Sequence, residues 1–599
     1  MINNLFKFLN ESQIKAFKSI NNHTLVLASP GSGKTSVLTR RIGYLLDIGI
    51  KENEIVAFTF TKKAANEMKA RVYKMLDDKN IDSISTFHSY CFSWLKTYNY
   101  NTKYIIIDEE ETEHILKDII EKYNIHKTII EAYKIITSVK NEMEIFSPTY
   151  FEQKENLILY YEYEKILQSQ NKLDFDDMNL KMLSLLKQDN TFKELVSNNL
   201  KYILVDECQD LNKVQYSIIK EIGHNANIFM VGDPDQSIYE WRGSDIKIIE
   251  TFISDYYPDI IYLNQNYRSY SKIVEYSNKL ISKNELRFDK YAIPYKTGGL
   301  VYYDNFKNET DSANFIVKII KDNPNKSVFI LHRNNNLSTI YEKTLKENNI
   351  NYSIKGKPFY EYSEIKLIFA YYRLLFNSND EEALDRVLSY PKRGIGEVTL
   401  TNLLFKSRFD GISLYDEFKI SDNKNVINFY NEIEHLKELF KTTKPIEFFD
   451  ILINYIHINE CVDYIPDKLE RIHYIKESLN IESTNYIDDT YNILTNMFLD
   501  KEKETKNTNI TIMSMHQSKG LEADIVFIVD AMEGIIPSIK QERLKDIEQE
   551  RKLFYVSMTR AKEQLYILSS SKRYLKGITK TYIPSRFIFD SGLIEEEVN

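Results

Sequence analysis

Short apolar runs that end in polar residues recur along the chain and alternate with stretches of helical periodicity. Those before residue 265 are LVL at 25–27, EIVAFTF at 54–60, YILVDE at 202–207 and NIFMVGD at 227–233. Those after it are SVFILHR at 327–333, NITIMSMH at 509–516, DIVFIVDA at 524–531 and EQLYILSS at 563–570. Continuous apolar runs separated by helices are typical of parallel strands buried on both faces. The pattern predicts an α/β protein with two doubly wound parallel sheets.

Each predicted sheet is interrupted by a mostly helical segment. A 3.6-residue period is visible within 90–195, in EEETEHILKDIIEKYNI, and residues 376–505 also have a helical pattern. The second segment ends in the polar, charged run DKEKETKNTN at 500–509, which indicates a linker or hinge. We predict a first lobe from 1–90 and 196–265 with insertion 91–195, and a second lobe from 266–375 and 506–599 with insertion 376–505.

Composition narrows the class without deciding the function. The 599 residues include 78 basic and 87 acidic side chains, a net charge of −9, which argues against a basic surface overall but not against a local basic groove. No apolar run approaches the roughly 20 residues of a membrane-spanning helix, and the N-terminus does not resemble a signal peptide. Cys91, Cys208 and Cys461 are far apart and lack zinc-site spacing. We expect a reduced, cytoplasmic setting and no membrane partner.

The stretch ASPGSGKT follows a predicted strand and opens a helical pattern, the context of a phosphate-binding loop. Gly31 and Gly33 would let backbone N–H groups turn toward phosphate oxygens, and the helix N-terminus would add partial positive charge. Lys34 would reach the β- and γ-phosphates, while the Thr35 hydroxyl would bind Mg²⁺. The alternative is a glycine turn that binds nothing. The predicted nucleotide-binding stretch is Ala28, Ser29, Pro30, Gly31, Ser32, Gly33, Lys34, Thr35 and Ser36.

An acidic pair stands at the end of another predicted strand, in VDECQD at 205–210. Asp206 would hold Mg²⁺, and Glu207 would orient and deprotonate an attacking water. Carboxylates at strand ends are often only solvated. A phosphate-binding loop on the same sheet favours the catalytic interpretation.

Nine motifs in one order make the chain resemble superfamily-one DNA helicases of the UvrD/Rep/PcrA group. They are LNESQ (9–13), ASPGSGKT (28–35), TFTKKAANEM (59–68), STFHS (85–89), DECQD (206–210), GDPDQSIYEWRG (232–243), LNQNYRS (263–269), HQSKGLE (516–522) and YVSMTRAK (555–562). The resemblance covers nearly the whole chain. It implies two RecA-like lobes of the P-loop NTPase class that bind ATP between them, each interrupted by a helical subdomain.

The resemblance also implies roles for individual nucleotide-site residues. Gln13 would read the adenine edge, Tyr267 would stack on adenine, Gln236 would touch the γ-phosphate, Arg268 and Arg560 would act as arginine fingers, and Glu522 would bind the ribose. Fixed guanidinium groups stabilise the charge that spreads over a migrating phosphoryl group. Ser36 stands where several relatives carry arginine, which puts one auxiliary nucleotide contact in doubt.

The segment GDPDQSIYEWRG places an amide, Gln236, a few residues before two aromatic residues and an arginine. Tyr239 and Trp241 would form a platform on which bases stack, an interaction worth roughly 1–3 kcal/mol per base that tolerates any sequence. Arg242 would contact a phosphate or stack on a ring. The alternative for Trp241 is a core position with its N–H satisfied.

Other contacts to nucleic acid follow from the resemblance. Phe60 would stack on a base, and Thr61, Lys63, His88, Arg333, Asn335 and His516 would meet the strand or its phosphates. Both histidines could instead be hydrogen-bonded structural residues. Gly394 and Gly396, in PKRGIG at 391–396, resemble a duplex-contacting element, although a plain helix–helix turn fits this stretch almost as well. Backbone contacts carry no sequence information, so we expect little sequence preference.

These observations predict an ATP- and Mg²⁺-dependent DNA translocase and helicase. The resemblance implies 3′→5′ movement on single-stranded DNA, action at single/double-strand junctions, and a role in repair, replication restart or recombination, with repair or nuclease proteins as partners. One alternative is a DNA-dependent ATPase that remodels protein–DNA complexes, and another is the helicase subunit of a system that defends against foreign DNA. A binding subunit that uses ATP only as a gate fits less well, because it would not need the hydrolytic residues.

Overall fold

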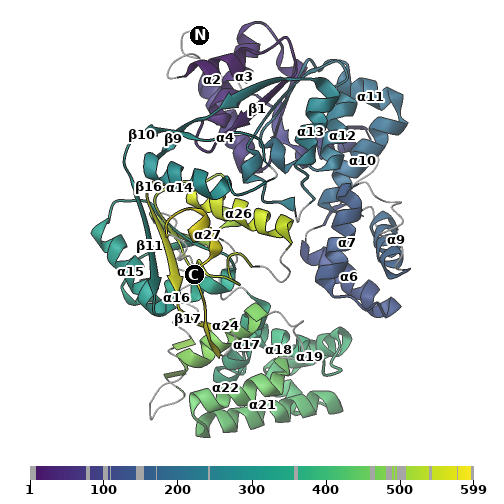
Figure 1. Ribbon diagram of the computed structural model, residues 1–599. Helices are drawn as coiled ribbons and strands as arrows, with labels where there is room; N and C mark the ends of the chain where they lie inside the picture. Colours follow the sequence, from purple (N-terminus) through teal and green to yellow (C-terminus); the bar gives the residue numbers. More distant parts are fainter. Residues whose placement is uncertain are drawn as a thin grey trace. The chain divides into compact units, whose positions relative to one another are not determined.

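A computed structural model describes most of the chain in two compact units (Figure 1). The described residues are 9–594 apart from 76–80, 99–104, 108, 143–153, 170–171, 241–242, 286, 356–361, 459–465, 480–486, 488, 491–492, 495–507, 539–542 and 576–577. The first unit comprises Met1–Val301, Ile539–Gln564 and Phe587–Asn599, and the second comprises Tyr302–Ser538 and Leu565–Arg586.

The first unit is built on a six-stranded parallel sheet with the strand order β3-β2-β6-β7-β1-β8. Its strands are β1 (Thr24–Ala28), β2 (Ile55–Thr59), β3 (Ile84–Thr86), β6 (Tyr202–Val205), β7 (Asn227–Gly232) and β8 (Asp259–Leu263). Every residue of β1 and β2 is buried, as their apolar sequences predict. Because the strands are parallel, their carboxyl ends lie at one edge, and the motifs that follow β1, β2, β3, β6 and β7 gather there.

The first unit also contains helices, some of which pack on this sheet and some of which form the insertion. The helices are α2 (Glu11–Lys18), α3 (Lys34–Asp47), α4 (Lys62–Met75), α5 (Phe87–Tyr98), α12 (Lys213–Ile222), α13 (Lys247–Tyr256), α14 (Ser271–Ile281), α26 (Leu544–Met558) and α27 (Arg586–Asp590). The insertion contributes α6 (Glu109–Tyr123), α7 (Ile129–Glu142), α9 (Lys154–Ser169), α10 (Phe175–Gln188) and α11 (Asn190–Ser197), with the short strands β4 (Ile105–Ile106) and β5 (Lys172–Leu173). The remaining elements are η1 (Glu52–Glu54), η2 (Cys208–Asp210), η3 (Pro234–Gln236), β9 (Gln265–Tyr270) and β10 (Ile293–Lys296).

A buried arginine fixes α2 against this sheet. Arg41 on α3 is fully buried, and its guanidinium donates to main-chain carbonyls at the C-terminal end of α2, among them that of Phe17 at 3.4 Å. It also donates to Asn227 Oδ1 at 3.0 Å and lies over the ring of Phe229. A cation near a helix C-terminus satisfies carbonyls that have no partner within the helix. Arg41 therefore helps to hold α2, and with it the predicted adenine-reading residue, in place.

A second buried cation holds the helical insertion together. Lys140 on α7 is fully buried, with its Nζ 2.7 Å from Glu164, 2.7 Å from Asp174 and 2.6 Å from Asp177. Burial opposes the charge, but the carboxylates outweigh it and raise the pKa of Lys140 well above its ordinary value. These ion pairs join α7 to α9 and to the start of α10.

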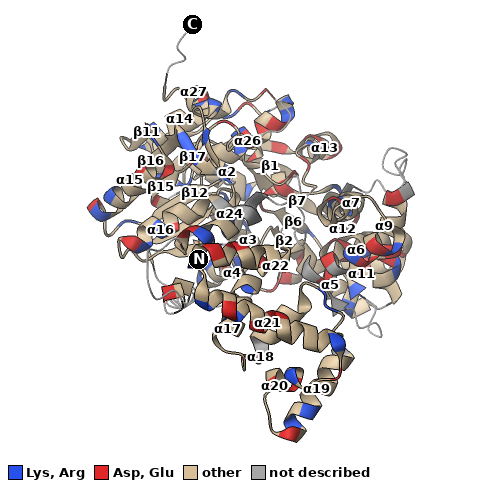
Figure 2. Cartoon of the chain, turned by 90° about the horizontal axis from the view of Figure 1, so that it is seen from below, with Lys and Arg blue, Asp and Glu red and all other residues tan. Residues whose placement is uncertain are grey.

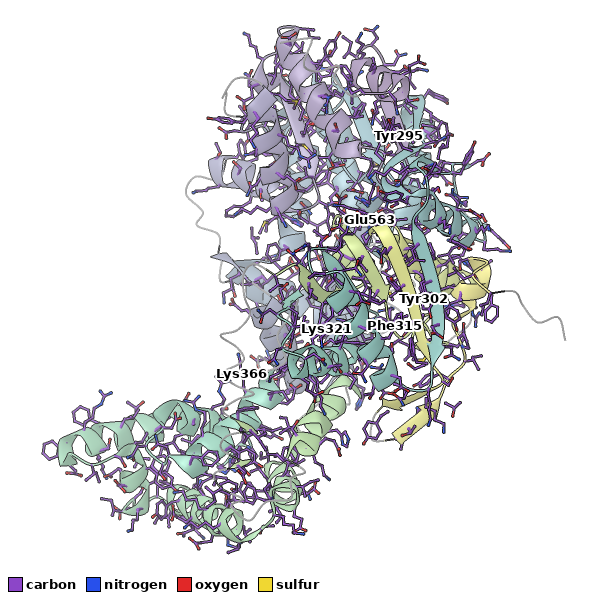
Figure 3. All side chains as sticks on the ribbon, turned by 90° about the vertical axis from the view of Figure 1, so that its left-hand side faces the viewer. Tyr295, Tyr302, Phe315, Lys321, Lys366 and Glu563 are labelled. Carbon is purple, nitrogen blue, oxygen red and sulfur yellow. The ribbon has the colours of Figure 1, made fainter. Side chains whose placement is uncertain are left out.

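The second unit contains the other six-stranded sheet, with the order β11-β16-β15-β12-β14-β13, in which β15, β12, β14 and β13 run parallel. Its strands are β11 (Leu300–Phe306), β12 (Val328–His332), β13 (Ser353–Lys355), β14 (Ile510–Ser514), β15 (Ala523–Ile528) and β16 (Ala561–Ser570), beside the hairpin β17 (Lys572–Leu575) and β18 (Ile578–Thr581). Helices α15 (Glu309–Asp322) and α16 (Thr339–Glu347) accompany η5 (Asn335–Ser338) and η8 (His516–Ser518). Tyr302 and Phe315 stack with centroids 5.6 Å apart and so pack α15 on β11 (Figure 3).

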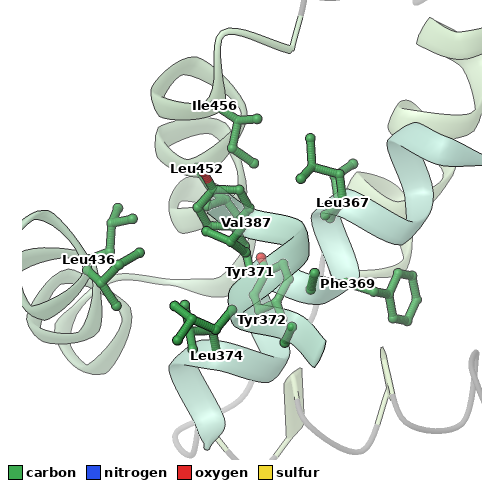
Figure 4. Packing of buried hydrophobic residues seen from close by; sticks show 14 of the residues in the cluster. Leu367, Phe369, Tyr371, Tyr372, Leu374, Val387, Leu436, Leu452 and Ile456 are labelled. Atoms are coloured by element: carbon green, nitrogen blue, oxygen red, sulfur yellow. The ribbon is translucent and has the colours of Figure 1, made fainter. Parts of the chain in front are cut away.

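The second helical segment has a core of its own. Its helices are α17 (Ser363–Phe376), α18 (Glu381–Ser389), α19 (Glu397–Asp410), α20 (Leu414–Lys419), α21 (Lys424–Thr442), α22 (Pro445–Ile456) and α24 (Pro466–Ser478). Leu367, Tyr371 and Tyr372 of α17 pack with residues of α18, α21 and α22 (Figure 4). Because α17 is buried along most of its length, it forms the centre of this bundle.

The predicted fold class is confirmed. Each apolar run became a strand, β1, β2, β6, β7, β12, β14, β15 or β16, and the two sheets fall before and after residue 265 as expected. Basic and acidic residues are interspersed along the outer helices (Figure 2), in line with the near balance of charge. None of the described helices is long and apolar enough to cross a membrane. The predicted linker at 500–509 lies mostly outside the described residues.

We expect Lys140→Met to destabilise the first unit by about 3–5 kcal/mol, because removing one partner leaves buried carboxylates uncompensated. Urea denaturation monitored by fluorescence would measure the loss. Lys122→Met is the matched control, since Lys122 is exposed and pairs only loosely with Glu162 at 3.8 Å. Equal midpoints for the two variants would show that the Lys140 cluster contributes little to stability.

Candidate nucleotide and DNA site

The phosphate-binding turn follows β1 and ends at the first residue of α3. Gly33 caps α3 with φ +84°, and Gly31 has φ +66°, conformations that glycine adopts without strain. A Cβ at Gly31 would lie 2.6 Å from the Cβ of Arg268, and the N–H of Tyr267 donates to the Gly31 carbonyl at 3.0 Å. Gly31 therefore also lets the start of β9 lie directly on the turn.

Two serines of the turn have buried hydroxyls whose hydrogen-bonding capacity is not used by the residues that the structure describes. Within the described part of the chain, neither Ser29 Oγ nor Ser32 Oγ has a hydrogen-bond partner. Buried polar atoms are nearly always satisfied, so such atoms in a glycine turn at a helix N-terminus fit phosphate oxygens. At Ser36, where arginine was expected from the resemblance, the hydroxyl accepts a hydrogen bond from Arg40 one turn later on α3.

The acidic pair lies where β6 ends. Lys34 Nζ is 3.4 Å from Glu207 Oε1, so the phosphate-loop lysine and the predicted base already meet. Glu207 has φ +49°, an uncommon conformation for a residue with a side chain and one that clusters at functional sites. Burial, and then the adjacent charge of Glu207, raise the pKa of Asp206 to about 7. The pair thus holds more negative charge than Lys34 alone can balance.

This donor set fits a magnesium ion held mainly by phosphates. The described residues contain no cluster of three or more His, Cys, Asp or Glu side chains that could hold a metal. Magnesium is commonly bound by one or two carboxylates together with substrate phosphates and water. The half-buried Thr35 at the start of α3 and the buried Asp206 supply one hydroxyl and one carboxylate.

The predicted adenine-binding residues lie together above the turn. Gln13 donates to the Ser32 carbonyl at 2.8 Å and closes a capping box with Asn10 at the start of α2. Asn10 in turn donates to the Tyr267 hydroxyl at 2.8 Å, and Tyr295 lies beside Tyr267 with ring centroids 5.1 Å apart. Figure 3 shows Tyr295 on β10. Gln13 and Tyr267 are therefore linked through one asparagine.

A hydrogen-bonded path joins the predicted base to a predicted arginine finger. Gln209 donates its side-chain amide to Glu207 and accepts the main-chain N–H of Asp233 at 2.8 Å. The Asp233 carboxylate accepts the amide of Gln236, whose carbonyl oxygen accepts Arg560 Nη2 at 3.0 Å. Gln209 and Asp233 are completely buried. A displacement of Glu207 can therefore be passed to Arg560 through this chain of hydrogen bonds, and a displacement of Arg560 can be passed to Glu207.

The two predicted fingers meet at Thr559. Arg560 is 2% exposed and donates to the Val556 carbonyl at 2.8 Å and to Thr559 Oγ1 at 3.0 Å. Arg268 donates to the main-chain carbonyl of Thr559 at 3.1 Å. Both arginines belong to the same compact unit as Lys34, whereas the sequence-based division placed them in the second lobe. That division into four segments stays a prediction.

Two of the predicted base-stacking residues are stacked on each other. Phe60 follows β2 and Tyr239 follows η3, and their rings lie 5.0 Å apart and 15° from parallel. Phe60 remains 41% exposed, so part of this residue is accessible to a ligand. Trp241 and Arg242 lie outside the described residues, and their roles stay predictions.

The other predicted track residues of the first unit follow β2 and β3. Thr61 and Lys63 are exposed at the start of α4, where Thr61 Oγ1 accepts the N–H of Ala64. Thr61 therefore also has a structural role as a helix cap. Burial lowers the pKa of His88, so its ring is neutral near pH 7 and suits hydrogen bonding better than ion pairing. Its ring lies edge-on to that of Phe175, an exposed aromatic that the sequence did not single out.

Four predicted residues lie at strand ends in the second unit. Arg333 and His516 follow β12 and β14, which are parallel neighbours, so both stand at the same edge of that sheet. Asn335 begins η5, but its side chain lies outside the described part of the structure. Glu522 is exposed immediately before β15. The roles predicted for all four remain predictions.

The PKRGIG stretch forms the turn before α19. Gly394 has φ +70°, and a Cβ there would lie 2.7 Å from Asn425 Nδ2, whereas the space around Gly396 is open. Arg393 points inward and donates to the hydroxyls of Tyr371 and Tyr455 at 2.9 and 3.0 Å. Duplex contact and a structural turn both remain open for this element.

Sequence reasoning missed several residues that organise the site. Gln209 and Asp233 stand inside motifs that were recognised, but no role was attached to them. Asn10 was visible as a helix cap three residues before a glutamine. Only spatial proximity identifies Arg287 and Lys290, which pair with the GDPDQ turn from more than 50 positions away.

Comparisons with known proteins agree with the motifs. Residues 9–257 match the family described as UvrD/REP helicase N-terminal domain, and residues 261–572 match the UvrD-like helicase C-terminal domain. The ATP-dependent DNA helicase PcrA of Staphylococcus epidermidis (strain ATCC 35984) is 33% identical over 648 residues, covering 98% of this chain and 87% of the relative. That of Staphylococcus aureus (strain NCTC 8325) is 33% identical over 644 residues, covering 98% and 86%.

We expect Gln209→Ala to lower kcat for ATP hydrolysis about 10- to 100-fold, because Glu207 keeps its charge but loses the N–H that orients it. Steady-state ATPase assays with saturating single-stranded DNA would measure the change. Cys208→Ala is the control, since this neighbouring side chain is buried in the apolar core. Equal kcat values for the two variants would show that Gln209 does not orient the base.

Proposed function

This chain belongs to the UvrD/Rep family of DNA helicases and is an ATP-dependent DNA helicase, and we propose that it moves 3′→5′ along single-stranded DNA and separates duplex at junctions. The observation that best supports this mechanism is the buried path from Glu207 through Gln236 to Arg560. A protein that only binds ATP needs neither a base nor a finger. Here the predicted base and the predicted finger are joined by hydrogen bonds.

The phosphate side of the site supplies orientation and charge. Lys34 would hold the β- and γ-phosphates, and the buried Ser29 and Ser32 hydroxyls would donate hydrogen bonds to their oxygens. Thr35 and Asp206 would hold Mg²⁺, which neutralises phosphate charge when bound. These groups fix the γ-phosphate in line with an attacking water.

Glu207 would then take the proton of that water. In the structure its carboxylate contacts Lys34 and Gln209, and these two neighbours set its direction. Positioned general bases typically contribute 10²- to 10⁴-fold in rate. Arg268 and Arg560 would stabilise the charge of the migrating phosphoryl group, an effect on the order of 10³- to 10⁵-fold.

The predicted DNA-binding residues of this segment begin at Tyr239, three positions after Gln236. Tyr239 stacks with the exposed Phe60, so both rings are held in one orientation beside the nucleotide site. We propose that bases stack on this pair and on Trp241. A change in the position of Gln236 on hydrolysis would reach the bases through Ser237 and Ile238, both of which are buried.

The substrate and setting follow from the family and the chain. We propose single-stranded DNA and its junctions with duplex as the nucleic-acid partners, with little sequence preference because the contacts are to bases as stacked faces and to phosphates. Repair, replication restart or recombination would be the process, with repair or nuclease proteins as partners. The buried free thiols of Cys91 and Cys208 suit a reducing cytoplasmic setting.

Glu207→Gln should reduce DNA-stimulated ATPase activity at least about 100-fold while ATP still binds, because the amide cannot accept the proton. Phosphate release and nucleotide-binding titrations would measure the two properties separately. Glu54→Gln is a control, since that carboxylate pairs with Lys201 at the amino ends of β2 and β6, the edge opposite the predicted site. Retained hydrolysis in Glu207→Gln would contradict the proposed role.

Unwinding assays on three duplexes should separate the proposed motor from its rivals. We expect strand separation with a 3′ single-stranded tail and with a fork, and little with a 5′ tail. Equal unwinding from both tails would contradict the polarity. ATP hydrolysis without unwinding of any substrate would favour an ATPase that remodels protein–DNA complexes.

A further inference from the structure

Four charged side chains lie in or against the turn that carries Gln236. Asp233 and Asp235 belong to the GDPDQ turn, while Arg287 and Lys290 come from the segment between α14 and β10. Lys290 Nζ lies 2.6 Å from Asp233 Oδ1 and 2.8 Å from Asp235 Oδ2, and Arg287 Nη2 lies 2.9 Å from Asp235 Oδ2. Lys290 and both carboxylates are at most 1% exposed. Two positive and two negative charges thus balance in the interior of the first unit.

Such a cluster needs an explanation other than stability. Removing charges from water is costly, and well-packed apolar residues often stabilise a protein as much as a buried ion pair. Burial opposes the charge of Lys290, yet Asp233 and Asp235 outweigh it and raise its pKa above the ordinary value. The same burial would raise the pKa of Asp235, but Lys290 and Arg287 lower it. The ion pairs therefore keep Lys290 and Asp235 charged in spite of their burial.

The two oxygens of Asp233 have different partners. Oδ1 accepts Lys290 and the main-chain N–H of Asp235, whereas Oδ2 accepts the side-chain amide of Gln236. The side-chain amide of Gln236 donates through its nitrogen and accepts through its oxygen. When the nitrogen donates to Asp233, the carbonyl oxygen is turned toward Arg560. The position of Lys290 therefore determines which oxygen of Asp233 is left for Gln236.

Arg287 supports this arrangement from behind. Its guanidinium makes a two-pronged contact with Asp235, at 2.9 and 3.3 Å, and also donates to the main-chain carbonyl of Lys290 at 2.6 Å. A bidentate pair has a defined geometry as well as charge. Through these contacts Arg287 is tied both to Asp235 and to the main chain of Lys290.

We propose that Lys290 is a positioning residue for ATP hydrolysis, which acts by clamping Asp233 so that Gln236 presents its carbonyl oxygen to Arg560. The inference rests on the proposed roles of Gln236 and Arg560 and extends them to a residue outside every recognised motif. Lys290 itself would not touch the nucleotide. Without Lys290, Asp233 would be a buried carboxylate with no cationic partner, free to turn away from Gln236 or to attract Arg560.

The test is a double-mutant cycle on the full chain. Lys290→Met should lower kcat for DNA-stimulated ATP hydrolysis about 10- to 100-fold while KM for ATP changes less than about 3-fold, because only orientation in the transition state is lost. Gln236→Ala should lower kcat on its own. In the Gln236→Ala background, Lys290→Met should cost less than about a further 3-fold. Fully multiplicative losses would overturn the proposal.

Asp235→Asn is the matched control for a merely structural effect. It weakens the pairs with Lys290 and Arg287 but leaves the Lys290–Asp233–Gln236 contacts in place. We expect Asp235→Asn to lower the unfolding temperature about as much as Lys290→Met does, but to lower kcat less than about 3-fold. A loss of kcat as large as that of Lys290→Met would overturn the positioning role.

A further variant covers the case in which Lys290→Met does not fold. Asp233→Asn combined with Lys290→Met removes both charges together, so no unpaired charge stays buried. We expect a folded protein with kcat about 10-fold or more below that of the wild type, and wild-type activity would overturn the proposal. Glu207→Gln is measured in parallel. Normal hydrolysis by Glu207→Gln and Gln236→Ala would overturn the proposed function, whereas normal hydrolysis by Lys290→Met alone would overturn only this inference.

Discussion

The predicted nucleotide site depends on the side-chain carboxamide of Gln236, whose nitrogen and oxygen are both hydrogen-bonded. Gln236 donates to Asp233 and accepts from Arg560, and it is nearly completely buried. Because an amide nitrogen donates and its oxygen accepts, the direction of this single group decides whether Arg560 gains a further contact besides those with Val556 and Thr559. On one side the path continues through Gln209 to Glu207, and on the other the chain leads within three residues to Tyr239.

Buried charge organises the first unit at three sites. Lys140 and Lys290 are surrounded by carboxylates and stay charged, and each joins segments that are distant in sequence. Asp206 differs, because burial and Glu207 raise its pKa to about 7 while Lys34 compensates only in part. Two of these sites are complete within the protein. The third carries an excess of negative charge, which a cation accompanying a triphosphate would balance.

The same parallel sheet positions both the predicted ATP-binding residues and the predicted DNA-binding residues. Residues predicted to contact phosphate or magnesium and residues predicted to contact DNA follow neighbouring strands, so Phe60 after β2 and Asp206 after β6 stand at one edge. The stacking of Phe60 with Tyr239 links the residue after β2 to the segment that follows Gln236. The two predicted ligand sites are joined by a short stretch of main chain. Because strand ends in a packed sheet are stiff, a displacement at one site would reach the other without a flexible element between them.

The sequence by itself determined the strands, the order of the motifs and the chemistry of the phosphate site. Apolar runs predict buried parallel strands because every residue must leave water, and ASPGSGKT predicts its turn because only glycine adopts the required backbone without strain. Tertiary structure alone decided the pairing of Arg287 and Lys290 with the GDPDQ turn, the contact of Gly31 with Arg268, and the inward direction of Arg393. These contacts depend on distances between segments far apart in the chain, and a charged residue in an irregular stretch has no periodicity that reveals its partner. Local physics therefore specifies elements and motifs, whereas the pairing of buried charges becomes visible only when the elements have packed.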